Sequence, residues 1–380
     1  MKFTLSITQD CNLRCGYCYI KKKHETMPLQ TARKAVDFIF GKKRPGEEAS
    51  IGFFGGEPLL EFGLLKKIVS MIKEHPKYDP KGISFTVTTN GTIFDREIAR
   101  YIVEEEINFC LSIDGPPRLQ DANRRFSDGS PSSHVVERNI RRAIEELPSV
   151  VVNAVYTPAT FRSLPEVVKY LAGLGLRRIY FNPDYSAGWD MKDAQALSEA
   201  YGGVADFYVN CYLEGRPIHI SPLDDKIAVI MRNGYEPQER CSMGTGEFAI
   251  SPSGLIYPCE RLIGPDTGEG AIGSLDNGCD PGLMSCRTVP KGELNHECLS
   301  CTVRPYCMNW CGCSNYFSSG FYNRVSPFQC ASEKALLSAA FKAFERLDQE
   351  VGAATFMEHF SGRPAANSCM EGAEAGTKNQ

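Results

Sequence analysis

The segment from Cys11 to Cys18 carries the most distinctive chemistry in this chain. Its cysteines follow a C-x3-C-x2-C pattern at positions 11, 15 and 18, after an apolar run that starts at Phe3. Three thiolates on one short loop can ligate three irons of a 4Fe–4S cluster, whereas a cluster held entirely by protein needs four ligands. The spacing therefore predicts a cluster with one iron open to a small molecule. A half zinc site fits less well, because zinc sites favour C-x2-C pairs and four ligands.

Tyr17 precedes the third cysteine, and with it the segment resembles the signature of radical S-adenosylmethionine (SAM) enzymes. In that family the open iron chelates the amine and carboxylate of SAM, and reductive cleavage of SAM yields a 5′-deoxyadenosyl radical. The resemblance implies a SAM-binding 4Fe–4S cluster held by Cys11, Cys15 and Cys18.

Later segments resemble the motifs with which this family holds SAM. Residues 55–58 are similar to the Gly-Gly-Glu-Pro motif that binds the amino group, and residues 112–116 resemble the segment whose serine contacts the ribose. Relatives also carry an arginine for the SAM carboxylate, at a distance that fits two adjacent residues here. The resemblance places at the SAM site Tyr17, Gly55, Gly56, Glu57, Asn90, Ser112, Asp114 and either Arg124 or Arg125. For Asn90, Asp114 and the arginines, a capping or scaffolding role is an equal alternative.

A second group of cysteines lies between residues 241 and 330, in a region rich in glycine and proline. Its spacing resembles the SPASM extension of radical SAM enzymes that mature peptides and proteins, which holds two further 4Fe–4S clusters. The resemblance assigns the distal cluster to Cys298, Cys301, Cys307 and Cys330. It assigns the proximal cluster, nearer the active site, to Cys241, Cys259 and Cys311. Structural zinc is the alternative, and metal analysis after anaerobic purification distinguishes the two.

The proximal set departs from the family pattern at two positions. Sulfatase-maturating relatives have a further cysteine six residues after the first, where this chain has Glu247. The proximal cluster is therefore expected either to have an open iron or to recruit Glu247, Cys279 or Cys286. In addition, Cys313 lies two residues after Cys311 and could replace it as the ligand.

Glu260 directly follows the proximal ligand candidate Cys259. In anaerobic sulfatase-maturating enzymes the equivalent position is an aspartate proposed to deprotonate the substrate. Glu260 is expected to act as a catalytic base if burial raises its pKa toward neutrality. A surface ion pair with Arg261 is the alternative.

The elements that must position these residues alternate regularly between strand and helix patterns. β-Branched and aromatic runs predict strands at residues 3–8, 50–54, 83–88, 109–113, 150–156 and 179–182. Amphipathic patterns predict helices near residues 29–41, 62–74, 95–104, 134–147 and 164–174. Such alternation implies right-handed crossovers and a parallel sheet. Six units predict an α/β fold, a partial (β/α)6 TIM-like barrel, with its site at the carboxyl ends of the strands.

The expected organisation is a radical SAM barrel at 1–190, a helical linker at 191–240, a small cysteine-rich SPASM domain at 241–335, a C-terminal helix at 336–362 and a disordered tail at 363–380.

A net charge of −4 gives no electrostatic reason for nucleic-acid binding. No apolar run approaches the ~20 residues that a membrane span needs, and we expect no signal peptide because the first residues already fit the first predicted strand. The protein is expected to be soluble and cytoplasmic, where sixteen cysteines indicate metal binding rather than disulfides.

Together these features predict a radical SAM oxidoreductase with three 4Fe–4S clusters that modifies a peptide or protein side chain. The expected reaction forms a thioether or carbon–carbon cross-link in a ribosomally made peptide. The expected partners are an electron donor such as flavodoxin or ferredoxin and, because the sequence starts at the barrel, a separate leader-peptide recognition protein. Oxidation of a sulfatase cysteine or serine to formylglycine is the alternative reaction. A non-catalytic iron–sulfur electron carrier is the alternative of another class.

Overall fold

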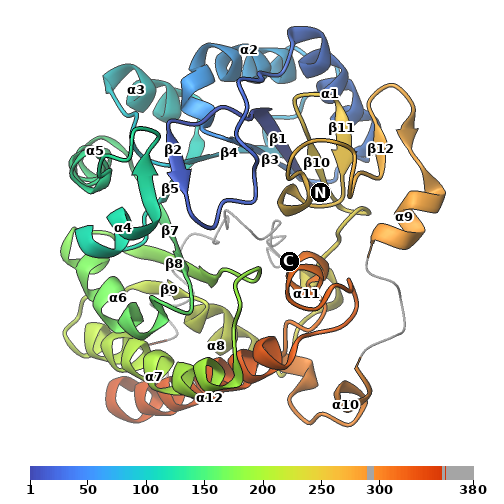
Figure 1. Cartoon of the computed structure of the whole chain (residues 1–380). Coiled ribbons are helices and arrows are strands. Elements are labelled where there is room, and N and C mark those ends of the chain that lie inside the picture. The colour runs from blue at the N-terminus through green and yellow to red at the C-terminus, as the bar shows by residue number, and fades with distance from the viewer. Residues whose placement is uncertain (289–294, 353–355, 357–380) are drawn as a thin grey trace, which may run out of the picture.

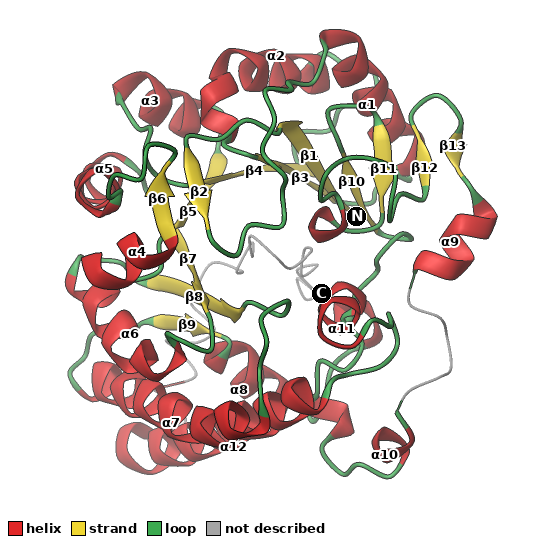
Figure 2. Cartoon of the chain, viewed as in Figure 1, coloured by secondary structure: helices red, strands yellow, loops and turns green. Residues whose placement is uncertain are grey.

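A curved, largely parallel sheet forms the centre of the molecule in the computed structural model, which describes residues 1–288, 295–352 and 356. The eleven strands have the order β13-β12-β11-β10-β1-β3-β4-β5-β7-β8-β9. Helices α2, α3, α5, α6 and α7 lie along the outer side of the arc (Figure 1). Figure 2 shows loops gathered on the inner side. The fold therefore leaves one face of the sheet for a site.

Eight neighbouring strands pair in parallel: β10 (Glu247–Ile250), β1 (Lys2–Thr8), β3 (Ala49–Gly55), β4 (Ile83–Thr89), β5 (Ile107–Ser112), β7 (Val151–Tyr156), β8 (Arg178–Pro183) and β9 (His219–Ser221). The antiparallel strands that continue from β10 are β11 (Leu255–Tyr257), β12 (Gly273–Ser274) and β13 (Gly278–Cys279). A separate two-stranded ribbon joins β2 (Leu13–Cys15) to β6 (Arg124–Phe126).

The α-helices of the first part of the chain are α1 (Leu29–Lys42), α2 (Phe62–Lys73), α3 (Arg96–Glu104), α4 (Pro117–Asn123), α5 (Ser133–Glu146) and α6 (Leu164–Gly173). Those of the second part are α7 (Met191–Leu213), α8 (Leu223–Met231), α9 (Pro281–Arg287), α10 (His296–Leu299), α11 (Gly312–Ser319) and α12 (Pro327–Leu347). Among the described residues, no helix combines the length and apolar character that crossing a bilayer requires.

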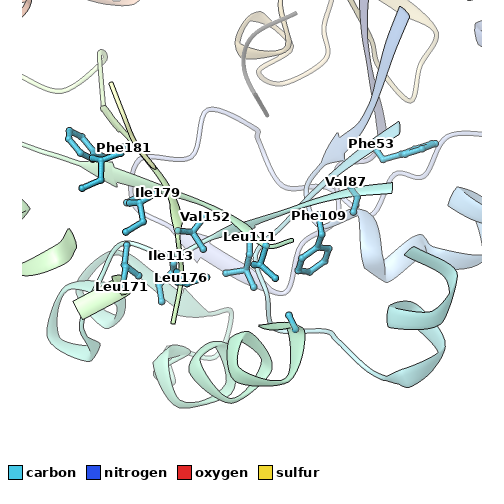
Figure 3. Close-up of a cluster of buried hydrophobic side chains, with 14 of the residues drawn as sticks. Phe53, Val87, Phe109, Leu111, Ile113, Val152, Leu171, Leu176, Ile179 and Phe181 are labelled. Carbon is cyan, nitrogen blue, oxygen red and sulfur yellow. The ribbon is translucent and has the colours of Figure 1, made fainter. Parts of the chain in front are cut away.

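Strand residues alternate between the helix-covered face and the interior of the arc. Phe3, Leu5 and Ile7 of β1 are completely buried in the main hydrophobic core. Figure 3 shows residues of neighbouring strands in the same layer, among them Phe109 and Leu111 of β5. The intervening positions of β1, Lys2 and Thr4, line an interior cavity instead. The two-residue period of a strand thus separates the core face from the site face.

The predicted α/β fold with a parallel sheet is confirmed, and all six predicted strands are present within two residues of the expected bounds. Two parallel strands were not predicted. The region expected as a helical linker contains β9, which pairs with β8. The cysteine-rich region contributes β10, which pairs with β1 in the register Lys2 to Glu247. The cysteine-rich region therefore continues the sheet of the barrel, and the proposed domain boundaries cross a shared sheet.

The expected C-terminal helix begins earlier than predicted, because α12 starts at Pro327 and packs along α7. Ser326 caps it by accepting a hydrogen bond from the Gln329 N–H. The predicted tail at 363–380, with Cys369, lies outside the described residues.

A buried ion pair connects α8 to α12. Lys226 on α8 has only 1% of its side chain exposed, and its Nζ lies 2.7 Å from Oε2 of Glu333 on α12. The same ammonium donates to the Tyr306 carbonyl at 2.8 Å, and the same carboxylate accepts the Met308 N–H at 2.9 Å. These contacts also attach the loop that precedes α11.

Candidate active site

The three cysteines of the 11–18 loop line one cavity of about 210 Å³ inside the arc. Leu13 N–H donates to the Cys11 sulfur at 3.4 Å, and the Lys22 ammonium lies 3.0 Å from the Cys18 sulfur. Burial raises the pKa of Cys15 to about 11, although the Arg124 charge opposes this effect. Three convergent thiols with N–H and ammonium donors beside them are a donor set that fits an iron–sulfur cluster.

The Gly55-Gly56 turn brings the backbone at the end of β3 into close contact with the backbone at the start of the cysteine loop. Gly55 has φ +133°, and a Cβ on Gly56 would lie 1.9 Å from the Asp10 carbonyl oxygen. Gly56 and Glu57 donate their backbone N–H groups to Thr8 and Asp10 at 2.7 and 2.8 Å. Only glycine permits this approach, so the turn fixes where the cysteine loop leaves β1.

The Glu57 carboxylate lies behind the cavity wall rather than in the cavity. It is completely buried and accepts hydrogen bonds from Thr89 Oγ1, Asn90 N–H and Leu59 N–H at 2.7, 2.7 and 3.0 Å. Burial raises its pKa, and these donors oppose the rise. Gly55, Gly56, Asn90 and Ser112 do line the cavity. The geometry therefore gives Glu57 a positioning role at the end of β4.

Asp114, Tyr17 and Arg124 form a hydrogen-bonded cluster at the end of β5, in which Asp114 and Arg124 are buried. Asp114 accepts hydrogen bonds from the Tyr17 hydroxyl at 2.7 Å and from Arg124 Nε at 3.0 Å. Strand pairing places Arg124 opposite Cys15, and Arg124 lines the cavity. Arg125 instead donates to the Gly129 carbonyl at the exposed side of the ribbon. Of the two candidate arginines, the structure thus brings only Arg124 to the site.

If Arg124 binds the SAM carboxylate as the resemblance implies, we expect Arg124→Gln to weaken SAM binding by at least about tenfold, because a charged hydrogen-bond donor would be lost. Arg125→Gln should change the affinity by no more than about twofold, as is usual for exposed positions. Equilibrium binding of SAM to the anaerobic protein measures both. Equal affinities for the two variants would contradict the placement of Arg124 at the SAM carboxylate.

The cavity wall also includes charged residues near the amino end of β1. Lys2 Nζ lies 3.0 Å from Oε1 of Glu247, and ligand atoms of Glu247, Cys259 and Glu260 all lie within 4.8 Å of one another. Glu260 is only 8% exposed and lines the cavity. Arg261 also lines it, with its guanidinium 5.4 Å from the Tyr185 ring centroid. The alternative in which Glu260 is a surface residue paired with Arg261 is therefore not supported.

The two carboxyl groups differ in their pKa. Burial raises the pKa of Glu247 to about 7, and the nearby Glu260 charge adds to the rise. Burial also acts on Glu260, but the Lys2 ammonium nearby holds the pKa of that carboxyl below its ordinary value. The rise in pKa toward neutrality that the sequence predicts for Glu260 is thus found at Glu247 instead. The condition set for a base role at Glu260 is therefore not met, since a lowered pKa makes this carboxylate a weaker base than expected.

Four cysteines of the C-terminal region meet beside this charged group. Cys311 and Cys313 have their sulfurs 3.8 Å apart. Cys241 and Cys259 pack in the same cluster of side chains as these two residues. The two other cysteines considered for this cluster are placed differently. Cys279 pairs in β13 at the edge of the sheet, and Cys286 is exposed on α9.

A second set of four cysteines lines a separate pocket between α10 and α12. Its members are the residues expected for the distal cluster, Cys298, Cys301, Cys307 and Cys330. Their side chains come from a short helix, two loops and the first turn of α12. The convergence of four thiols from distant positions in the sequence fits a metal cluster better than it fits an apolar core.

Several cavity residues were missed in the sequence. They are the inward strand positions Lys2, Thr4, Ser50, Thr86, Asn153 and Asn182, together with Tyr185 and Arg261. The available signal was the alternation of polar and apolar residues along β1, β3 and β4, since polar residues on a buried parallel strand face an interior site.

The fold and the three-cysteine site define a class of protein. Residues 5–171 match the model of the radical SAM superfamily, and the chain therefore contains a radical SAM domain, a kind of domain that uses a 4Fe–4S cluster and SAM. The predicted resemblance to radical SAM enzymes is thereby confirmed.

Relatives extend the similarity into the cysteine-rich region. A cysteine-type anaerobic sulfatase-maturating enzyme of Clostridium novyi is 23% identical over 329 residues, 80% of this chain and 85% of that protein. A radical SAM cyclopropyl synthase of Paramaledivibacter caminithermalis is 24% identical over 334 residues, 81% of this chain and 66% of that protein. An uncharacterized Methanocaldococcus jannaschii protein is 32% identical over 179 residues, but the match spans only 60% of its length.

Solved structures share the fold. The anaerobic sulfatase-maturating enzyme anSMEcpe with bound AdoMet superimposes with a TM-score of 0.76 at 20% identity, over 92% of this chain and 99% of that chain. Streptococcus suis SuiB bound to its precursor peptide SuiA gives a TM-score of 0.58 at 18% identity, over 87% of this chain and 75% of that chain.

Proposed function

We propose that this protein uses SAM to oxidise a side chain of a peptide or protein substrate by radical chemistry. The observation that carries the proposal is one cavity lined by the three-cysteine loop, Arg124 and Glu260, with the Cys259 thiol of a second cysteine group within 4.8 Å of Glu260. When bound, the cluster and SAM supply the hydrogen-abstracting radical. A relative named as a sulfatase-maturating enzyme and a neighbour solved with a precursor peptide support a peptide or protein substrate.

The residues of the chain would bind and orient the reactants. Arg124 would pair with the SAM carboxylate, while the Gly55-Gly56 backbone, Asn90 and Ser112 would contact the rest of SAM. Asp114 and Glu57 would hold Arg124 and Asn90 in place through the hydrogen bonds described above. A cavity inside the arc would also limit the access of water to reactive species. The expected electron donor is a flavodoxin or ferredoxin.

Glu260 would accept the proton that the oxidised substrate loses. We expect Glu260→Gln to lower turnover of the peptide by about 10²-fold, as is usual for loss of a general base, while 5′-deoxyadenosine still forms. The exposed Glu269 of the same region offers a matched control, and Glu269→Gln should leave turnover unchanged. Full turnover by Glu260→Gln with intact clusters would remove Glu260 from the mechanism.

Our preferred reaction is cross-link formation in a ribosomally made peptide, with a separate protein for leader recognition. Formylglycine formation is the second candidate, favoured by the coverage and TM-score of the sulfatase-maturating relatives. The decisive experiment is anaerobic co-expression with short peptides encoded beside the gene and with a sulfatase, followed by mass spectrometry. A cross-link retains every heavy atom and loses two hydrogens, whereas formation of formylglycine from cysteine removes the sulfur.

An electron carrier without catalysis predicts a different result. Reduced protein with verified clusters, SAM and substrate would then produce no 5′-deoxyadenosine. Formation of 5′-deoxyadenosine would exclude the carrier.

A further inference from the structure

We infer that Cys241, Cys259, Cys311 and Cys313 are together the four ligands of the proximal cluster. In this arrangement Cys313 supplies the thiolate that Glu247 cannot provide. Cys311 and Cys313 then act as two ligands rather than as alternatives for one. The inference rests on the proposed function in one respect, namely that the cysteine-rich region binds iron–sulfur clusters.

The four thiols lie together in the folded chain. The Cys311 and Cys313 sulfurs are 3.8 Å apart, and Cys241 and Cys259 pack in the same cluster of side chains. Cys259 and Cys313 are 5% and 6% exposed, so both sulfurs face the protein interior. Cys311 is the residue before α11 and Cys313 lies in its first turn, which brings the two side chains to the same place. Four convergent thiols are the usual complete ligand set of a 4Fe–4S cluster.

Glu247 lies beside this site but is already paired. Its carboxylate lies within 4.8 Å of the Cys259 sulfur and of the Glu260 carboxylate. It also accepts a hydrogen bond from Lys2 at 3.0 Å. Position 247 therefore lies beside the cysteines, while the glutamate itself interacts with Lys2. The cysteine that sulfatase-maturating relatives have at the start of β10 is thus replaced, in this inference, by Cys313 in the first turn of α11.

Ligation of the proximal cluster by four thiolates has a consequence for how the substrate binds. A proximal cluster with four thiolates has no iron open to a substrate atom. The substrate must therefore be held by cavity side chains such as Arg261 and Tyr185, and the proximal cluster acts in electron transfer alone.

The test uses the full-length chain in which Cys11, Cys15 and Cys18 are changed to alanine, so that only the auxiliary clusters remain. Cys313→Ala, Cys313→Ala with Glu247→Cys, and the exposed Cys286→Ala as a matched control are compared. Iron content and the EPR spectrum of the reduced protein, with and without ¹³C-labelled cyanide, are the readouts. Neither readout depends on substrate or on SAM turnover.

We expect no cyanide coupling in the parent protein or in Cys286→Ala. Cys313→Ala should either lose about four irons per chain or acquire cyanide coupling at a newly open iron. Addition of Glu247→Cys should restore the iron content and remove the coupling. Cyanide coupling in the parent protein, or a Cys313→Ala protein with full iron and no coupling, would overturn the inference and leave the proposed function intact. Zinc in place of iron would overturn the inference together with the expectation of iron–sulfur clusters in the cysteine-rich region.

Discussion

Cys15→Ala is expected to reduce 5′-deoxyadenosine formation to the level of a protein-free control. Cys15 lines the cavity between Cys11 and Cys18 and is held by strand pairing opposite Arg124. With two thiolates left on the loop, the site lacks the ligands to retain a cluster, and the iron content should fall by about four atoms per chain. Chromatography of anaerobic reactions with SAM and dithionite, together with iron analysis, measures both effects.

The matched control is Cys211→Ala. Cys211 is a buried cysteine on α7 with 6% exposure and contributes to the apolar core rather than to a cavity. Its replacement should leave both iron content and 5′-deoxyadenosine formation unchanged. Retention of SAM cleavage by Cys15→Ala would contradict the assignment of the three-cysteine loop.

Glu333→Gln is expected to lower the free energy of unfolding by about 3–5 kcal/mol, because it leaves the Lys226 ammonium buried without its counter-charge. The Lys226 side chain is only 1% exposed, and the Glu333 carboxylate lies 2.7 Å from its Nζ. The same carboxylate accepts a hydrogen bond from the Met308 N–H in the loop before α11. We therefore expect this loop to be attached less firmly to α12 in the variant. Urea unfolding of the anaerobic holoprotein, followed by circular dichroism, measures the change.

An exposed ion pair provides the comparison. Lys66 and Glu97 lie 2.7 Å apart with side chains 38% and 57% exposed. Glu97→Gln should therefore cost no more than about 1 kcal/mol. Replacing both buried partners, as in Lys226→Met with Glu333→Leu, should recover most of the lost stability, because no unpaired charge remains. Equal losses in the free energy of unfolding for Glu333→Gln and Glu97→Gln would show that the Lys226–Glu333 pair contributes no more to stability than the exposed pair.

The sequence alone was sufficient for the parts of this protein that depend on local patterns. The ligand loop at 11–18 is recognisable because three ligands on one loop must follow a fixed spacing. The strands and helices between residues 3 and 183 are recognisable because apolar residues recur with periods of two and 3.6. Their alternation then leaves few topologies other than a parallel sheet, and β1, β3, β4, β5, β7 and β8 appear accordingly.

Tertiary structure decided everything that depends on which distant residues meet. The four-residue strand β10 is too short to have a distinctive pattern, and only its pairing with β1 shows that the cysteine-rich region completes the sheet. Adjacent Arg124 and Arg125 are equivalent in sequence, but they point to opposite sides of a two-stranded ribbon, so one reaches the cavity and the other is exposed. Glu57 appeared to be a ligand for an ammonium group, yet its hydrogen bonds turn it toward β4. Cys313 joins Cys241, Cys259 and Cys311 only through the folded positions of β11 and α11, because spacing within a sequence does not specify distances between separate elements.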